Sequence, residues 1–223
     1  MPGPSRFCVV IPAFNEAGHI PPVIEAVRKH GVDVVVIDDG STDETTRVSK
    51  GAGAQVIRQE SNQGKGAALQ RGFQYALDNF YEALITMDAD GQHDPAEVAL
   101  FIDTYDRTGI PVLIGNRMAD TTNMPIVRRC TNRLMSGLLG RHMRQYIPDS
   151  QNGFRLYQVD VLPMVSTEAR GYAAESEILL KLDRIGIRMD SIPVKTRYGT
   201  EQSKIRPVKD SIRFLRMLFR YVR

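Results

Sequence analysis

Tryptophan is absent from this chain of 223 residues, cysteine occurs only twice, and long apolar runs are missing. Cys8 and Cys130 lack the spacing of metal ligands, so we expect two free, reduced thiols rather than a disulfide framework or a zinc site. No run of about 18 apolar residues occurs, and the first apolar stretch is too short and wrongly flanked for a signal peptide. We therefore expect a cytoplasmic protein.

Two common nucleotide-binding motifs are also missing. The glycines around Gly64 and Gly66 lack the third glycine of the GxGxxG pattern, and the Gly64-Lys65 pair lacks the earlier glycine and the following Ser or Thr of a P-loop. These absences exclude a GxGxxG dinucleotide site and a P-loop ATPase. Lys65 begins a predicted helix and can still approach a diphosphate; the alternative is a solvated lysine in a glycine turn.

The charge of the chain is unevenly distributed. The formal net charge is +3, but segment 195–223 holds nine Lys or Arg and two acids, a charge of +7 that leaves −4 for residues 1–194. Such a basic tail indicates an anionic partner, which can be a membrane surface, nucleic acid or a phosphorylated substrate. Nucleic acid is not expected, because the tail has no recognisable reading motif and mixes its cations with bulky apolar residues.

The same tail predicts a basic amphipathic helix over 207–223. Its apolar residues fall on one helical line, separate from a basic stripe; the line consists of Val208, Ile212, Leu215, Phe219 and Val222. Such a helix either lies on an anionic bilayer or packs its apolar side on its own domain. The first alternative predicts a peripheral protein at the inner face of the membrane.

Strand-like and helix-like segments alternate through the first half. We expect strands at 7–11, 32–37, 54–57 and 83–87, and helices at 20–30, 44–50 and 64–79. This alternation is typical of an α/β fold with a largely parallel sheet covered by helices.

Acidic residues follow several of the predicted strands. Asp38 and Asp39 come after the second strand, and Asp88 and Asp90 after the fourth. Ligands of open α/β sheets bind beyond the carboxyl ends of the strands, where these acids are expected to gather. The alternative for Asp38 and Asp39 is turn and helix-cap chemistry.

Asp88 and Asp90 are candidate metal ligands. Residues two apart in an extended segment face the same side, and Gln92 continues the alternation. A few hard oxygen ligands suit Mg²⁺ or Mn²⁺ that also holds a substrate phosphate. The alternative is an acidic turn before a helix, for which Asp94 before Pro95 is the clearest case.

In sequence order, seven segments resemble family 2 glycosyltransferases of the GT-A fold, and most resemble the dolichol-phosphate mannose synthase and polyprenyl-phosphate glucosyltransferase group. They are IPAFNE (11–16), VIDDGSTDET (36–45), QGKGAALQRGF (63–73), MDADGQHDP (87–95), GNRM (115–118), DSQNGFRLY (149–157) and VKTRYGTEQSKI (194–205). The resemblance implies a GT-A domain over 1–206 with a mixed, mostly parallel sheet, followed by the helix at 207–223. It also implies inverting transfer of a hexose from a nucleoside diphosphate sugar, GDP-mannose or UDP-glucose, to a polyprenyl or dolichyl phosphate, with Mg²⁺ or Mn²⁺.

The resemblance also assigns roles to residues. Nucleotide-sugar contacts are implied for Pro12, Phe14, Glu16, Asp38, Lys65 and Asp88, and metal contacts for Asp88, Asp90 and Gln92. Acceptor-phosphate contacts are implied for Arg117, Arg129 with Arg128 as the alternative, Ser203 and Lys204. Asp88, Asp90 and Arg117 are implied as catalytic. The alternative for the arginines is surface charge on a helix.

Two other functions remain open. A phosphate acceptor is already anionic, whereas a sugar or glycolipid hydroxyl needs a base, for which Glu175 or Glu177 is the candidate. Both glutamates can instead be acids that favour a helix N-terminus. The chain can also be a non-catalytic sugar-nucleotide-binding protein at the membrane, although Asp88 and Asp90 argue against this. His93 is expected to be a solvated loop histidine; the alternative is that it shuttles a proton or touches the metal.

Overall fold

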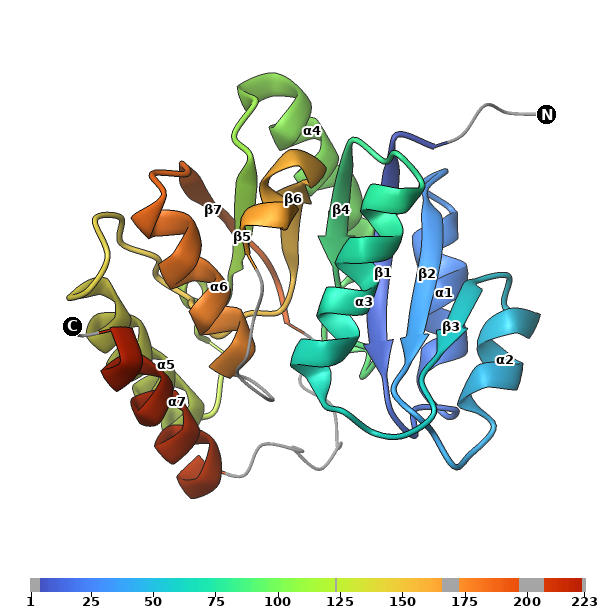
Figure 1. Ribbon diagram of the computed structural model, residues 1–223, viewed down its shortest axis with the longest axis horizontal. Coiled ribbons are helices and arrows are strands. Elements are labelled where there is room, and N and C mark those ends of the chain that lie inside the picture. The colour runs from blue at the N-terminus through green and yellow to red at the C-terminus, as the bar shows by residue number, and fades with distance from the viewer. Residues whose placement is uncertain (1–4, 123, 166–172, 197–206, 222–223) are drawn as a thin grey trace.

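The computed structural model describes residues 5–122, 124–165, 173–196 and 207–221 (Figure 1). The strands are β1 Phe7–Ala13, β2 Asp33–Asp38, β3 Gln55–Arg58, β4 Ala83–Thr86, β5 Val112–Asn116, β6 Arg155–Gln158 and β7 Met189–Pro193. The α-helices are α1 Ile20–Arg28, α2 Thr45–Gly51, α3 Lys65–Asp78, α4 Val98–Thr108, α5 Ile126–Gly140, α6 Ala173–Arg184 and α7 Pro207–Tyr221. Short 3₁₀ turns are η1 Pro95–Glu97, η2 Arg117–Ala119 and η3 Val159–Met164. The strands and helices expected in the first half are confirmed, with ends shifted by one or two residues.

In the described residues, the strands form one sheet in the order β3-β2-β1-β4-β6-β5-β7. All neighbouring pairs are parallel except those made by β6, which runs antiparallel to both β4 and β5. The expected mixed, mostly parallel sheet is therefore confirmed. The arrowheads of β1, β2 and β4 point to the same edge, so the loops that follow them meet there (Figure 1).

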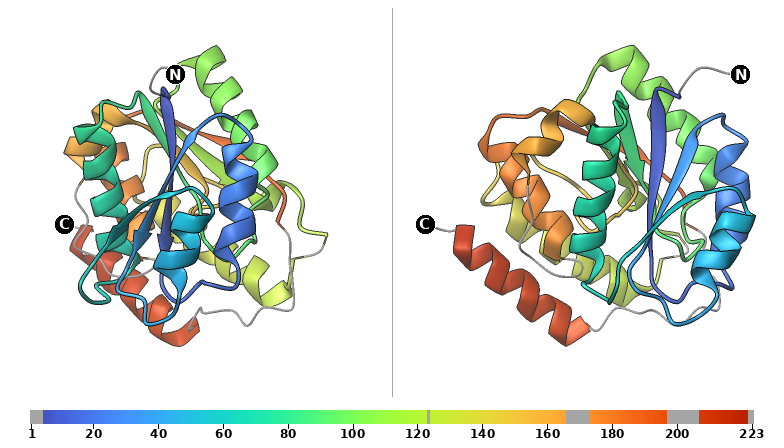
Figure 2. Two further views of the ribbon diagram at one scale, coloured as in Figure 1. Left: turned by 90° about the vertical axis from the view of Figure 1, so that its right-hand side faces the viewer. Right: turned by 45° about the vertical axis from the view of Figure 1, so that its right-hand side comes forward.

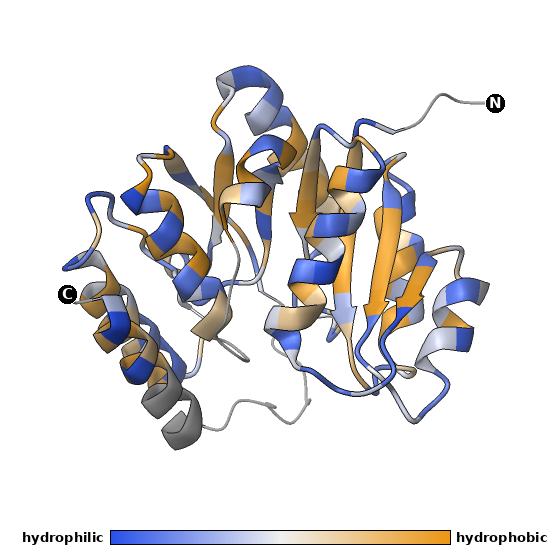
Figure 3. Ribbon diagram, viewed as in Figure 1, coloured by the Kyte–Doolittle hydropathy of each residue, from blue (hydrophilic) through white to orange (hydrophobic). Residues whose placement is uncertain are grey.

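Helices cover both faces of this sheet (Figure 2). Alternate residues of β1 enter two separate apolar clusters: Val9 and Ile11 pack with residues of α1 and α4, whereas Cys8 and Val10 pack with residues of α3 and α6. All four residues are fully buried. Burial on both faces explains the unbroken apolar runs of the central strands, which are orange in Figure 3.

Helix α3 lies tightly against β1. A Cβ atom built on Gly72 would be 2.3 Å from Cγ1 of Val10, so only glycine permits this approach. The close packing fixes the start of α3, and with it Lys65, beside the edge where the strand-end loops meet.

The two cysteines are free, as expected. Burial raises the pKa of the Cys8 thiol above its ordinary value, so Cys8 behaves as a small apolar core residue.

Helix α7 packs on α6 through only part of its apolar surface. Phe214, Met217 and Leu218 are buried, whereas Leu215 and Phe219 are exposed. Part of the expected apolar line therefore faces outward, because the residues flanking that line make the packing contact. Among the described residues, no helix is long and apolar enough to cross a bilayer.

Candidate active site

Asp88 follows β4 and forms the centre of a cluster of charged side chains. Lys65 Nζ lies 2.5 Å from Asp88 Oδ1 and 3.0 Å from Oε1 of Glu175, which comes from α6. Burial alone would raise the pKa of Asp88, but the positive charge of Lys65 and the hydrogen bond from His93 outweigh burial and lower it. Asp88 is therefore an anion at neutral pH.

Asp90 shares this edge with Asp88. Its Oδ1 accepts a hydrogen bond from the backbone N–H of Gln92 at 3.0 Å. Burial, followed by the negative charge of Asp88, raises the pKa of Asp90 above its ordinary value. The two carboxylates thus oppose one another's ionisation, and a cation between them would relieve this repulsion.

The donor set fits a hard divalent cation. No group of three or more His, Cys, Asp and Glu placed to hold a metal occurs in the part of the chain that the structure describes. Two carboxylates are nevertheless enough for Mg²⁺ or Mn²⁺ when water and substrate phosphate complete the coordination shell. Asp88 and Asp90 would hold such an ion.

The prediction for His93 is wrong. Its side chain is 3% exposed, and its Nε2 lies 3.5 Å from Asp88 Oδ2. The ring packs against Phe154 with centroids 5.1 Å apart, and the backbone forms a bridge with Thr196. The loop is therefore folded inward, so His93 lies beside Asp88 instead of in solvent.

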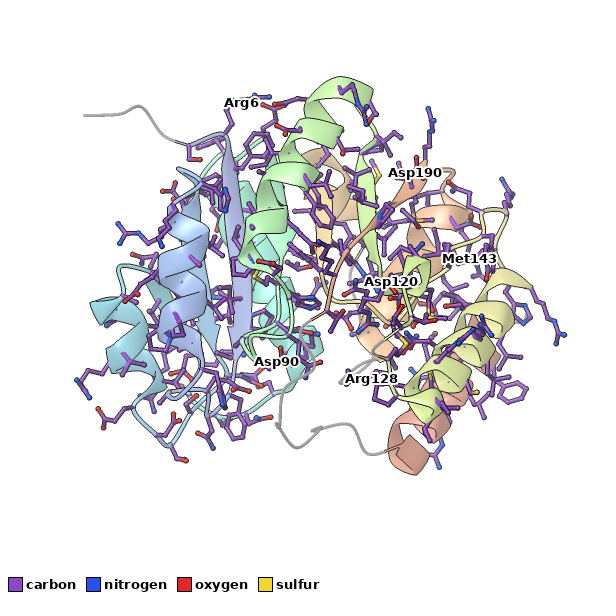
Figure 4. All side chains as sticks on the ribbon, turned by 180° about the vertical axis from the view of Figure 1, so that it is seen from behind. Arg6, Asp90, Asp120, Arg128, Met143 and Asp190 are labelled. Atoms are coloured by element: carbon purple, nitrogen blue, oxygen red, sulfur yellow. The ribbon has the colours of Figure 1, made fainter. Side chains whose placement is uncertain are left out.

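Gln92 links the loop that carries Asp90 to helix α5. Arg128 Nη1 donates a hydrogen bond to Gln92 Oε1 at 3.0 Å. Figure 4 labels Asp90 in the loop and Arg128 on the helix. Arg128 thus contacts the loop that carries Asp90; both Arg128 and the neighbouring Arg129 are half-buried.

A pocket of about 580 Å³ lies between the loop of residues 90–96 and α1. Asp90, Gln92 and His19 are among the residues that line it. Its volume lies in the range of small-molecule sites in proteins.

Gly153 closes the space around Asp88. The Thr86 hydroxyl donates to the Gly153 carbonyl at 2.7 Å, which holds the glycine at the end of β4. A Cβ built on Gly153 would lie 2.8 Å from Glu175 Oε1, 2.9 Å from Lys65 Nζ and 3.0 Å from Asp88 Oδ2. The absence of a side chain is therefore what lets these three charged groups meet.

Asp38 ends β2 and is held by hydrogen bonds from the segment that follows it. Asp38 Oδ1 accepts from the Ser41 backbone N–H at 2.8 Å, and its Oδ2 accepts from the Thr46 hydroxyl. These contacts are the turn and cap chemistry that was the alternative for Asp38. These hydrogen bonds fix the conformation of the loop that follows β2.

Asp39 has a positioning role that the sequence did not reveal. Its carboxylate accepts hydrogen bonds at 2.8 Å from the Gln59 side chain and from the backbone N–H groups of Gln63 and Gly64. Gly64 has φ of 93°, a conformation that favours glycine, and directly precedes Lys65. Asp39 therefore fixes the turn from which Lys65 reaches Asp88.

The other candidates for the nucleotide pocket follow β1. Pro12 is half-buried within the strand, and Phe14 at the loop is 38% exposed. Glu16 is buried beside the start of α1, where its Oε2 lies 3.1 Å from His19 Nδ1. Phe14 is thus the candidate with the largest exposed apolar surface.

Arg117 is buried against a partner that the sequence did not identify. Its Nε and Nη2 donate to the two carboxylate oxygens of Asp149 at 2.7 and 2.8 Å. Asn132 on α5 also donates to Asp149, at 3.0 Å. This bidentate ion pair anchors the end of β5 to the segment before β6. Ser203 and Lys204 lie outside the described residues.

The two candidate bases have different surroundings. Glu175 is 2% exposed, its Oε1 faces Lys65, and its Oε2 has no hydrogen-bond partner among the described residues. Glu177 accepts from the Tyr221 hydroxyl at 2.7 Å and lies 3.3 Å from Lys181 Nζ. Glu175 therefore belongs to the Asp88 cluster, whereas Glu177 joins α6 to α7.

A mostly parallel sheet with one antiparallel strand, and with acids at the carboxyl edge, defines a GT-A-like fold. Glucosyl-3-phosphoglycerate synthase from Mycobacterium tuberculosis, solved in complex with Mn²⁺, UDP and glucosyl-3-phosphoglycerate, aligns with a TM-score of 0.69. The alignment covers 99% of this chain and 85% of that chain at 21% identity, which shows the shared fold.

The family model for glycosyl transferase family 2 matches residues 8–164, and the chain belongs to this family. A UDP-N-acetylglucosamine–dolichyl-phosphate N-acetylglucosaminyltransferase from Methanococcus voltae is 28% identical over 92% of this chain and 91% of the relative. An undecaprenyl-phosphate mannosyltransferase from Micrococcus luteus is 28% identical over 85% of this chain and 82% of the relative. The family supports a glycosyltransferase activity that uses nucleotide sugars.

Proposed function

We propose that this protein transfers a hexose, with inversion, from a nucleoside diphosphate sugar to a polyprenyl or dolichyl phosphate at a membrane surface, using Mg²⁺ or Mn²⁺. The observation that carries the proposal is the cluster of Asp88, Asp90 and Lys65 at the carboxyl edge of the sheet. It combines carboxylates for a cation with an ammonium group suited to a diphosphate.

The donor half of the reaction breaks the bond between the anomeric carbon and the diphosphate. The electron pair leaves with the diphosphate, and a bound metal would stabilise that negative charge. Lys65 lies where it can contact the same phosphates from the start of α3. Asp39 fixes the turn before Lys65. Gly153 leaves room beside Lys65 because it has no side chain.

The acceptor half needs cations more than a base. A phosphate monoester oxygen is anionic near neutral pH and can attack the anomeric carbon without losing a proton. Arg129 on α5 is the candidate for holding it, since its Nε is buried without a hydrogen-bond partner among the described residues. The names of the Methanococcus voltae and Micrococcus luteus relatives support a lipid-phosphate acceptor.

Exposed apolar side chains on two helices support peripheral binding to an anionic membrane. Ile126, Val127 and Leu134 on α5 are 78, 72 and 63% exposed, and Phe219 on α7 is 71% exposed. Exposed arginines lie among them, including Arg216 next to Leu215. Apolar side chains beside cations suit the boundary between lipid headgroups and acyl chains.

A hydroxyl acceptor is the second candidate. Glu175 favours it, because this buried carboxylate lies beside Lys65 and has an oxygen without a hydrogen-bond partner in the described part of the chain. In that case Glu175 would remove the proton of the attacking hydroxyl.

The experiment offers labelled UDP-glucose and GDP-mannose, with Mn²⁺, to polyprenyl phosphate in vesicles and to glycolipid hydroxyl acceptors. We expect label only in polyprenyl phosphate, and a loss of about 100-fold or more in Asp90→Ala. Transfer only to hydroxyls, abolished in Glu175→Gln, would establish the second candidate instead. Binding of the sugar nucleotide without transfer to either acceptor would indicate a non-catalytic protein.

A further inference from the structure

The ammonium group of Lys65 lies beside Asp88, one of the two carboxylates that we propose bind the metal. Lys65 Nζ is within 3.0 Å of both Asp88 Oδ1 and Glu175 Oε1, and both acids come from other elements of the fold. The Lys65 side chain is 18% exposed and that of Glu175 is 3% exposed. The ammonium group therefore offsets part of the negative charge of Asp88 and Glu175.

Little space remains around this ammonium group. Lys65 Nζ, Asp88 Oδ2 and Glu175 Oε1 all lie within 3.0 Å of the point that a Cβ on Gly153 would occupy. A divalent ion held by Asp88 would share that carboxylate with the Lys65 ammonium group, and the two positive charges would repel each other in this partly buried site. Metal and Lys65 therefore compete for Asp88.

We infer that Lys65 is a tethered cation that holds Asp88 until a nucleoside diphosphate arrives, so that the divalent metal binds tightly only together with the nucleotide. This inference rests on the proposed function. The diphosphate supplies oxygens for the metal and a new anionic partner for Lys65, which then leaves Asp88. Because coupling between two ligands is reciprocal, the metal must strengthen nucleotide binding by the same factor.

Binding of Mn²⁺ is measured by the loss of the free-ion electron paramagnetic resonance signal, with and without saturating UDP or GDP. Lys65→Met alone removes the competing cation but also changes the net charge. The double variant Lys65→Met, Glu175→Gln keeps the net charge of the wild type, because it removes the Glu175 carboxylate that would otherwise stay buried without its lysine. Lys50→Met, an exposed lysine at the end of α2, is the control.

We expect the double variant to bind Mn²⁺ about tenfold more tightly than wild type without nucleotide, within the usual range of coupling between two ligands. Nucleotide should then enhance Mn²⁺ binding much less than in wild type, and Lys50→Met should match wild type. A double variant with wild-type Mn²⁺ affinity and wild-type enhancement would overturn the role of Lys65. A wild-type protein that binds no Mn²⁺ even with UDP or GDP would instead overturn the proposed metal site itself.

Discussion

At the scale of single residues, Gly153 leaves the space in which the charged groups of the site meet. The sequence shows it only as one glycine in a DSQNGF segment, and nothing local marks it as special. Its importance comes from tertiary packing, because Lys65, Asp88 and Glu175 approach it from three other elements. A pattern read along the chain cannot reveal such a meeting.

Gly153→Ala should therefore lower transfer activity by about tenfold or more while the protein remains folded. The added methyl group overpacks a charged site, and overpacking typically costs about 1–3 kcal/mol. Initial rates and urea unfolding measure the two effects.

Gly137→Ala is the matched control. Its Cβ would meet nothing within 4 Å, and it lies inside helix α5, where alanine is favoured over glycine by about 1 kcal/mol. Equal activity of the two alanine variants would contradict the account of Gly153.

The positions of some site residues could be predicted from the sequence, whereas the partners of others could not. The placement of Asp88 and Asp90 at the carboxyl edge follows from the alternation of strands and helices, and the structure has them there. The partner of Arg117 could not be predicted, because Asp149 lies 32 residues further along the chain. Likewise, His93 has a polar sequence neighbourhood, and its burial comes with contacts to residues far along the chain, namely Phe154 and Thr196.

At the scale of elements, periodicity predicted helices α1, α2 and α3 well and the strands of the second half less well. The buried stripe of α1 follows directly from its apolar spacing, at Ile20, Val23, Ile24 and Val27. Strand β6 was not identified, since Arg155–Gln158 is short and carries two polar residues. It is defined by its antiparallel partners β4 and β5, which lie far from it in the sequence.

Helix α7 allows a test within one element, because it has a buried and an exposed phenylalanine. Phe214→Ala should lower the free energy of unfolding by about 3 kcal/mol, since Phe214 is 2% exposed in the core. Phe219→Ala should leave stability within about 0.5 kcal/mol but weaken binding to anionic vesicles about tenfold, because Phe219 is 71% exposed.

Urea unfolding and vesicle co-sedimentation separate these two effects. Unchanged vesicle binding by Phe219→Ala would contradict a membrane role for the outer side of α7.

At the scale of the whole molecule, the two halves of the chain contribute different parts of the site. The parallel half supplies Lys65, Asp88 and Asp90, whose arrangement suits a nucleotide sugar and its metal. The second half supplies Gly153, in the segment before β6, and Glu175, on α6, which lie beside the same carboxylate. Sequence alone predicted the first group as a site and named Glu175 only as an alternative base, while Gly153 had no assigned role, since only the fold brings the halves together.

The central claim is that the new bond forms at a phosphate oxygen of the lipid. The most direct measurement is ³¹P nuclear magnetic resonance of polyprenyl phosphate after incubation with the protein, Mn²⁺ and UDP-glucose or GDP-mannose. We expect the phosphomonoester signal to become that of a phosphodiester, with a sugar of inverted anomeric configuration and one nucleoside diphosphate released per product. A phosphomonoester that stays unchanged while the sugar is transferred to a hydroxyl would contradict the account.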